Sequence, residues 1–146
     1  MPDVVSFVRI ETPDQLQAAL HIREAVFTQE QQVPAALERD EHDVLSATSV
    51  QHYLVVADGK PVATGRWRLA GPGQAKVERC AVLWSYRKLG YGRRLMQGLI
   101  AAVPAELGIY LHAQARSVPF YEKLGFKRQG DPFFEADIEH LKMRLR

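Results

Sequence analysis

Hydrophobic and polar positions follow two different periods in the first third of the chain. Residues 4–10 alternate between apolar and polar side chains, which predicts a strand. Residues 12–15 form a capping box with proline at the first helical position, so a helix begins there, and its apolar spacing continues to residue 29. The polar and acidic stretch 31–49 predicts a loop with a short helix.

The middle of the chain predicts three strands followed by a helix. Two apolar runs, 52–57 and 61–69, flank the turn Asp58-Gly59-Lys60, which is typical of a hairpin. A turn with two glycines then leads into a strand over 74–83. Residues 93–103 place their apolar side chains at helical spacing.

The last third predicts a strand over 109–113 and a helix over 117–124, whose first residue can cap it and which Gly125 can terminate. Residues 126–128 and 141–145 are predicted to be closing strands. The element order predicts an α/β sandwich in which antiparallel strands precede a βαβ unit. We therefore expect a mixed central sheet of about six or seven strands with helices on both faces.

The composition limits the possible classes of protein. A chain of 146 residues with 47% hydrophobic and 25% charged residues is typical of one globular domain, spanning 1–146. Its apolar runs are too short for a membrane span, and a net charge of +2 gives no argument for nucleic acid. A single cysteine, Cys80, and a start without the pattern of a signal peptide, residues 1–4, favour the cytoplasm.

The chemistry of the sequence is concentrated between the strand over 74–83 and the helix that follows it. The stretch Arg87-Lys88-Leu89-Gly90-Tyr91-Gly92 combines cations with glycines, and Arg93 adds another cation. Glycine lets backbone N–H groups approach an anion, and the first N–H groups of a helix have no partner within it. This pattern predicts a binding site for a diphosphate.

Two common nucleotide-binding motifs do not fit this stretch. A P-loop requires Gly-Lys-Ser/Thr after four spacer residues, and the sequence contains no such run. A dinucleotide fingerprint requires a third small residue where this chain has Leu95. Another class of phosphorylated ligand is therefore expected.

The remaining pattern, Arg-x-x-Gly-x-Gly within residues 81–92, resembles the acetyl-CoA pyrophosphate loop of the GNAT superfamily of N-acetyltransferases. Trp84 and Lys88 depart from a proline and a glycine that are frequent in this family. Neither departure removes the two glycines or the leading arginine that a phosphate site needs.

A second run, residues 114–126, resembles another GNAT motif, in which an asparagine near a strand end precedes a helix with the sequence Tyr-Glu-Lys-Leu-Gly-Phe. Gln114 takes the asparagine position and Ser117 a frequent alanine position, and the run from Tyr121 to Phe126 is intact. The element order also resembles the GNAT-like acyl-CoA N-acyltransferase fold. The chain therefore resembles a small bacterial-type single-domain acetyltransferase of this superfamily.

The resemblance implies acetyl-CoA as co-substrate and direct attack by a primary amine in a ternary complex. The pantetheine arm is then expected to pair with the backbone of Ala81 and Val82, which requires this strand to separate from its neighbour near Val82. Tyr121 is expected to protonate the leaving thiolate, and the N–H of Ala81 or Val82 to polarise the carbonyl. The implied cofactor-binding residues are Ala81, Val82, Arg87, Lys88, Leu89, Gly90, Tyr91, Gly92, Arg93, Gln114 and Tyr121.

The reaction also needs a base, because an alkylamine is mostly protonated at pH 7. Glu78 is the first candidate, since the period of two along a strand would place it on one face with Cys80 and Val82. Glu30 and His112 follow as alternatives.

Other interpretations of these residues stay open from sequence alone. Glu78 could instead pair with an arginine of the same sheet, and the candidates are Arg66, Arg68 and Arg79. Tyr121 could be a core aromatic, and the Cys80 thiol is expected to pack rather than carry an acyl group. The acidic cluster 38–43 is expected to be a solvated loop, with attraction of a cationic acceptor as the alternative.

The sequence thus predicts a cytoplasmic acetyl-CoA-dependent N-acetyltransferase with an unidentified amine acceptor. The acceptor could be a small amine, an amino sugar, an amino acid or a protein lysine. The five histidines lack metal-ligand spacing, so no metal is expected, and a homodimer could form through the C-terminal strands. The alternatives are a CoA-binding sensor without turnover and, last, a nucleic-acid-binding module built on Arg87, Lys88, Arg93 and Arg94.

Overall fold

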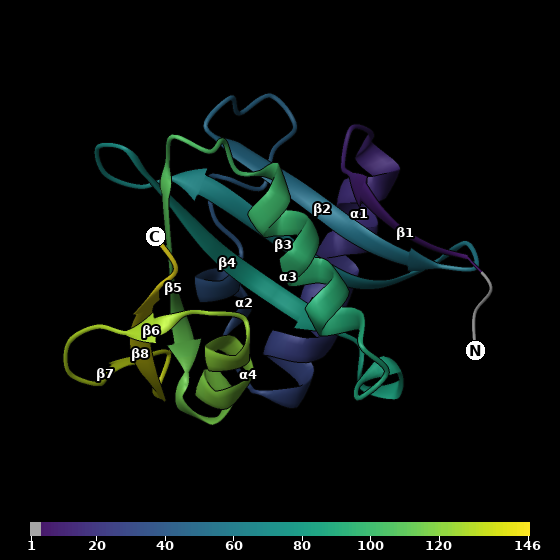
Figure 1. Ribbon diagram of the computed structural model, residues 1–146. Coiled ribbons are helices and arrows are strands. Elements are labelled where there is room, and N and C mark those ends of the chain that lie inside the picture. Colours follow the sequence, from purple (N-terminus) through teal and green to yellow (C-terminus); the bar gives the residue numbers. More distant parts are fainter. Residues whose placement is uncertain (1–3) are drawn as a thin grey trace.

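A computed structural model describes residues 4–146, so residues 1–3, within the segment considered for a signal peptide, lie outside it. Its centre is an eight-stranded sheet in the order β1-β2-β3-β4-β5-β8-β6, with β7 paired to β8 (Figure 1). The strands are β1 (Val5–Arg9), β2 (Val50–Ala57), β3 (Lys60–Leu69), β4 (Gln74–Val82), β5 (Gly108–Gln114), β6 (Lys127–Arg128), β7 (Phe133–Glu135) and β8 (Ile138–Arg144). No helix within 4–146 is both long and apolar enough to cross a bilayer.

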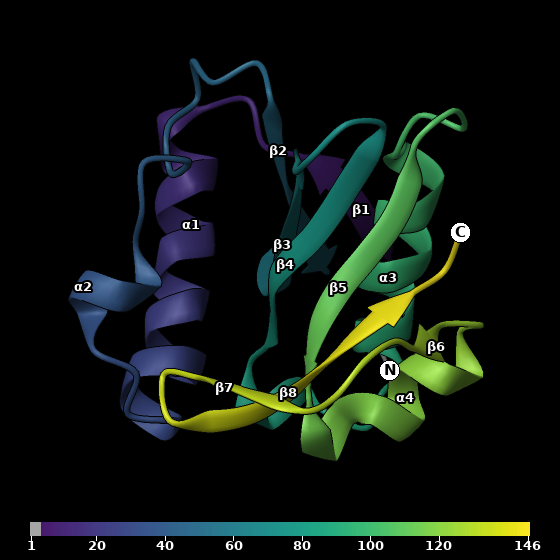
Figure 2. The same ribbon diagram turned by 90° about the vertical axis from the view of Figure 1, so that its left-hand side faces the viewer.

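Helices cover both faces of the sheet, as predicted (Figure 2). On one face lie α1 (Pro13–Arg23), the π-helical segment Glu24–Glu30 that continues it, and α2 (Ala35–Glu38). On the other face lie α3 (Tyr91–Ala102) and α4 (Val118–Lys123). Each face has its own apolar core, so burial of both sheet faces holds the three layers together.

The helix ends follow the capping signals of the sequence in most places. The capping box is present, since Gln15 N donates to Thr12 Oγ1 at 3.2 Å and Thr12 N donates to Gln15 Oε1 at 3.1 Å. Gly125 has a φ of 98°, as expected of a left-handed terminator. Ser117 occupies the N-cap position of α4, but its side chain makes no capping hydrogen bond, so this expected cap is absent.

The parallel pairing of β4 with β5 stops midway along both strands. Their Cα partners run from Gln74↔Gly108 to Val77↔Leu111, yet β4 continues to Val82 and β5 to Gln114. The two strands therefore diverge beyond Val77 (Figures 1 and 2). The expected separation is present, and it begins before Val82.

A β-bulge in β4 changes which side chains share a face. Arg79 and Cys80 stand opposite the single residue Gly65 of β3, and Arg79 has a φ of 57°. Upstream of the bulge, Glu78 faces the α1 side, where it meets the arginines of β3. Downstream, Cys80 and Val82 pack in the core beneath α3. The prediction that Glu78 shares a face with them is wrong, because the extra residue inverts the alternation.

The C-terminal region contains one strand more than the sequence predicted. The predicted strands 126–128 and 141–145 correspond to β6 and to most of β8, whereas β7 was missed. The turn between β7 and β8 has left-handed residues at Ala136 (φ 50°) and Asp137 (φ 62°). Because this hairpin turn contains no glycine, the usual sequence signal for it is missing.

Candidate active site

The predicted diphosphate loop connects the end of β4 to the start of α3. Lys88 and Gly90 are left-handed, with φ values of 64° and 91°. Such residues turn neighbouring N–H groups toward one side and form an anion-binding nest. Helix α3 begins at Tyr91, two residues before the predicted start, and Gly90 at its N-cap offers no side-chain acceptor. The first N–H groups of α3 are thus left for an anion, which the helix dipole also favours.

Gly92 connects this loop to the two other predicted parts of the site. A Cβ at Gly92 would lie 3.5 Å from Phe120 Cζ and 3.8 Å from Val82 Cγ2. The diphosphate loop, the end of β4 and helix α4 therefore converge at the point where β4 and β5 diverge.

Arg87, the leading residue of the loop motif, is held by contacts with the end of β4 and with the π-helical segment. Its Nε donates to the Val82 carbonyl at 3.0 Å, and its Nη2 lies 2.8 Å from Glu30 Oε2. The guanidinium also lies 5.3 Å from the centre of the Trp84 ring. Glu30, an alternative base in the sequence analysis, is thus an ion-pair partner of Arg87.

Tyr121 projects from α4 into the core on the α3 side of the sheet. Its ring packs edge-on against Phe120 and Phe126, with centroid distances of 5.1 and 5.8 Å. Burial, with a smaller contribution from Cys80, raises the pKa of the Tyr121 phenol far above its usual range. The phenol therefore carries its proton at every ordinary pH and can act as a donor.

Cys80 lies in the same apolar surroundings as Tyr121. Its Sγ is 3.9 Å from Met96 Sδ, and burial, with Glu78 adding to it, raises the pKa of the thiol to about 12. A thiol that stays protonated is a poor nucleophile, so the raised pKa and the contact with Met96 both fit a packing role for Cys80.

Gln114 faces the opposite side of the sheet from Tyr121. Its Nε2 donates to Gln31 Oε1 at 2.8 Å, which joins the end of β5 to the end of the π-helical segment. The predicted site residues therefore border one opening from its two faces, with Tyr121 on the α3 side and Gln114 and Glu78 on the α1 side.

Glu78 is paired with cations of the sheet. Its side chain is 8% exposed and accepts hydrogen bonds from Arg66 Nε at 2.8 Å and from Arg68 Nε at 3.0 Å. Burial alone would raise the pKa of Glu78, but Arg66 outweighs this, and the pKa is lowered. The pairing interpretation is confirmed for Arg66 and Arg68, while Arg79 pairs with Glu38 and Asp40 instead.

Behind Glu78, a buried ion-pair network fastens the acidic segment 38–43 to α1 and the sheet. Arg23, 1% exposed, lies 2.8 Å from Glu38 Oε2 and 2.6 Å from Asp43 Oδ1. Arg66, also 1% exposed, lies 3.0 Å from Asp43 Oδ1 and also bonds Asp40. The expected solvated loop is wrong for these three carboxylates, because they face buried arginines, whereas Glu41 is exposed. The missed signal was Arg23, a cation within the apolar stripe of the first helix.

Acid should weaken the fold through these carboxylates. Burial opposes the effect, but their arginine partners lower the pKa values of Asp40, Asp43 and Glu78 below the ordinary 3.8 and 4.5. Their stabilisation is complete above those ordinary values and is lost as the pH falls toward the folded-state values. We expect the urea midpoint, measured by tryptophan fluorescence, to stay level above about pH 5 and to fall steadily below about pH 4. A midpoint that is unchanged down to pH 3 would contradict this expectation.

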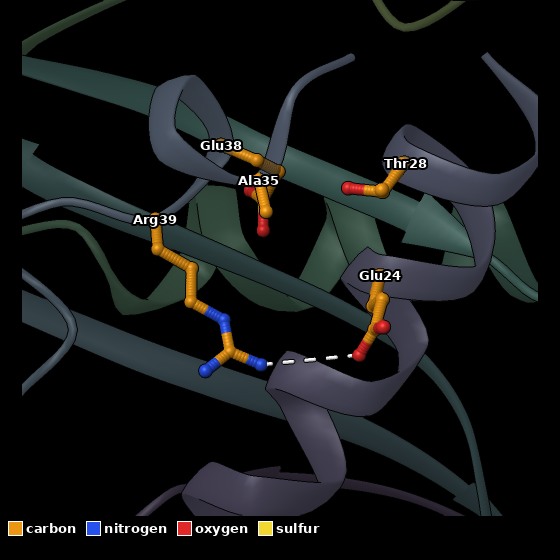
Figure 3. A pocket seen from close by; sticks show the side chains of 5 residues that line it. All are labelled: Glu24, Thr28, Ala35, Glu38 and Arg39. Atoms are coloured by element: carbon orange, nitrogen blue, oxygen red, sulfur yellow. Dashed lines mark ion pairs between the residues drawn. The ribbon is translucent and has the colours of Figure 1, made fainter. Parts of the chain in front are cut away.

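A small cavity of about 180 Å³ lies between the π-helical segment and α2, away from the opening (Figure 3). Glu24, Thr28, Ala35, Glu38 and Arg39 line it. Arg39 Nη2 and Glu24 Oε2 are 4.0 Å apart across its rim. None of the predicted cofactor-binding residues lines this cavity, so it is separate from the predicted cofactor site, and Glu38 connects it to the ion-pair network.

Comparison with known proteins decides the family. Residues 10–146 match the family model described as an acetyltransferase (GNAT) domain. The chain belongs to the GNAT acetyltransferase family. The match spans the diphosphate loop, the opening between β4 and β5, and helix α4.

Two curated proteins of Bacillus subtilis (strain 168) are similar to this GNAT domain over most of both chains. One, named Uncharacterized N-acetyltransferase YjcF, is 42% identical over 134 residues, which cover 89% of this chain and 91% of YjcF. The other, named Uncharacterized protein YyaT, is 41% identical over 138 residues, which cover 92% and 91% of the two chains.

Solved structures share the fold of this chain. The crystal structure of an acyl-CoA N-acyltransferase from Pseudomonas aeruginosa has a TM-score of 0.87 and 27% identity, covering 98% of this chain and all 100% of that one. Escherichia coli ElaA shares the fold, with a TM-score of 0.84 at 24% identity and coverages of 98% and 100%. This GNAT protein is therefore an N-acetyltransferase that uses an acyl-CoA as its co-substrate.

Proposed function

We propose that this protein transfers an acetyl group from acetyl-CoA directly to a primary amine in a ternary complex. The observation that carries the proposal is the end of β4–β5 pairing at Val77, beside a loop with left-handed Lys88 and Gly90 at a helix start. Backbone groups left without a strand partner suit the amides of an extended arm, and the loop suits a diphosphate at its end. The free thiol of Cys80 fits a reducing compartment, so we place the reaction in the cytoplasm.

In this proposal each predicted cofactor residue is assigned a role. The backbone of Ala81 and the N–H of Val82 pair with the arm, since the Val82 carbonyl already accepts from Arg87 Nε, and Gln114 borders the opening from β5. The amides that follow Arg87 hold the diphosphate, with cationic side chains around them. These loop residues are Arg87, Lys88, Leu89, Gly90, Tyr91, Gly92 and Arg93.

Tyr121 is proposed to protonate the sulfur as the carbon–sulfur bond breaks. The raised pKa of the Cys80 thiol indicates how strongly this environment disfavours a thiolate. A second sulfur leaving nearby needs a proton for the same reason, and the partly buried Tyr121 phenol is the donor proposed for it. The N–H of Ala81 or Val82 is proposed to polarise the carbonyl.

Glu78 as the general base stays a prediction. A carboxylate with a lowered pKa and two arginine partners has little tendency to accept a proton. The amine nevertheless has to lose one, so the α1 side of the opening needs another acceptor.

The test is an acceptor screen with acetyl-CoA, in which release of the CoA thiol is measured across small amines, amino sugars, amino acids and lysine peptides. Calorimetry with CoA runs in parallel. Turnover with at least one amine is expected. CoA binding without turnover on any amine would instead favour a sensor, and failure to bind CoA would overturn the proposed site.

Gly92→Glu should weaken CoA binding by about a hundredfold, because it places a carboxylate among the donors meant for a diphosphate. The matched control is Gly92→Ala, since a Cβ there meets its neighbours at 3.5–3.8 Å, which is ordinary contact. We expect the alanine variant to keep its fold and most of its CoA affinity. Calorimetry measures both, and equal affinities for the two variants would remove the proposed diphosphate loop.

A further inference from the structure

A histidine and a carboxylate form a close pair on the α1 side of the opening. His112 Nδ1, on β5, lies 2.8 Å from Glu135 Oε1, on β7. The side chain of His112 is 23% exposed, so the ring is accessible and still held by its surroundings. The proposed reaction has so far used neither residue.

The position of His112 follows from the pairing of β5. Leu111 is the last residue paired with β4, so His112 is the first residue of β5 along the open edge. Leu111 and Ala113 are buried in the core beneath α3, and strand alternation places His112 on the other face. That face is the one on which Gln114 meets the π-helical segment and Glu78 meets Arg66.

The surroundings fix the orientation of the His112 ring. Phe133 packs edge-on against it at 4.8 Å between centroids, and Tyr110 lies 5.9 Å away. Three charged groups on two strands face this pair. On β8, His140 Nε2 is 4.0 Å from Glu135 Oε2 and Lys142 stands opposite His112, while Lys76 on β4 lowers the pKa of Glu135. The ring is therefore held by packing as well as by its hydrogen bond.

The bond to Glu135 determines which nitrogen of His112 can accept a proton. The hydrogen bond from His112 is the main cause that lowers the pKa of Glu135, so this carboxyl is ionised near neutral pH. An ionised carboxylate only accepts hydrogen bonds, so Nδ1 carries the hydrogen. In the neutral ring the lone pair is then on Nε2, which has no hydrogen-bond partner within residues 4–146.

We propose that His112, oriented by Glu135, is the general base that accepts the proton of the acceptor amine, directly or through one water. This inference rests on the proposed acetyl transfer and names a base for it. Imidazole is suited to proton transfer near neutral pH, which the paired Glu78 is not.

The transfer balances with this pair of residues. The ammonium form of the acceptor gives one proton to His112 Nε2, and the resulting amine attacks the thioester carbonyl. The carbon–nitrogen bond forms, the carbon–sulfur bond breaks, and the sulfur takes the Tyr121 proton. The second amine proton then restores the phenol through solvent, and His112 releases its proton to water. The products are an acetamide, CoA thiol and one proton.

The two residues occupy opposite faces of the sheet at one opening. Tyr121 lies on the α3 side with Cys80, and His112 lies on the α1 side with Gln114. An amine entering from the α1 side therefore meets the base first, while the leaving sulfur is nearer the acid. Because the acid and the base lie on opposite faces, a proton cannot pass directly from Tyr121 to His112.

The experiment compares two nucleophiles in the thiol-release assay with acetyl-CoA at pH 7. One is the best alkylamine of the acceptor screen, which is mostly protonated, and the other is hydroxylamine, which is largely neutral and needs no base. His112→Gln should lower turnover with the alkylamine by at least about a hundredfold and with hydroxylamine by no more than a few-fold. Glu135→Gln should show the same selectivity with a smaller loss.

The matched control is His21→Gln, an exposed histidine on α1, which should leave both rates unchanged. Equal losses with both nucleophiles would show that His112 has only a structural role, and an unchanged alkylamine rate would overturn the assignment. If the unaltered protein acetylates no amine, the proposed function falls and the base assignment falls with it. Thermal melts of each variant verify that it is folded.

Discussion

Arg66→Met is expected to destabilise the protein by about 3–5 kcal/mol, the range observed when one partner of a buried ion pair is removed. Arg66 is 1% exposed and bonds Asp40, Asp43 and Glu78 at once. Burial alone would lower the pKa of Arg66, but its hydrogen bond with Asp40 and the charge of Glu78 outweigh this, and the pKa is raised. Methionine keeps most of the apolar part of the side chain, but Asp40, Asp43 and Glu78 each lose their ion pair with the guanidinium.

Urea unfolding followed by tryptophan fluorescence measures this effect, with Arg68→Met as the matched control. Arg68 contacts Glu78 alone among these carboxylates and is partly exposed, so its loss should cost about 1 kcal/mol or less. The Arg66 variant should also show a weaker dependence of the urea midpoint on pH, because its carboxylates have lost the partner that lowers their pKa. Equal destabilisation by the two substitutions would mean that the network contributes little to stability.

Tyr121→Phe is expected to lower turnover by about a hundredfold or more while CoA affinity changes little. The substitution removes one hydroxyl and keeps the ring, which packs against Phe120 and Phe126. The leaving thiolate then lacks the phenol that is proposed to protonate it. Because the group acts in the transition state, kcat should fall and the dissociation constant of CoA should not.

Tyr53→Phe controls for the loss of a buried phenol elsewhere. The Tyr53 hydroxyl donates to Gln51 on β2, at 2.6 Å, and takes no part in the proposed reaction. Steady-state kinetics and calorimetry compare the two variants. Full activity in the Tyr121 variant would remove the general acid, and a parallel loss of CoA affinity would assign Tyr121 to binding instead.

The helices, strands and turns could be predicted from the sequence because most of their signals involve only neighbouring residues. A capping box at residues 12–15, a hairpin turn at 58–60 and a left-handed Gly125 each require only neighbouring residues, and each has the expected conformation. The diphosphate loop is also a local feature, with two left-handed residues before a helix start. The family and the mixed sheet therefore followed from the residue pattern.

The errors arose where distant parts of the chain determine the outcome. The bulge at Arg79 contains no glycine, and it depends on Gly65, where a Cβ would lie only 2.9 Å from Leu99 and 3.0 Å from Cys80. Strand alternation alone could not reveal that Glu78 faces the opposite side from Cys80. The pairing of Glu135 with His112 likewise depends on β7, a three-residue strand without a turn signal.

The pairing of β4 with β5 ends early, so the sheet has two parts, β1 to β4 and β5 to β8. Only four pairs of residues in register join them. Beyond these pairs, the facing edges of β4 and β5 present backbone groups without a strand partner. A ligand that pairs with such an edge would extend the sheet at the place where its two parts are joined by the fewest main-chain contacts.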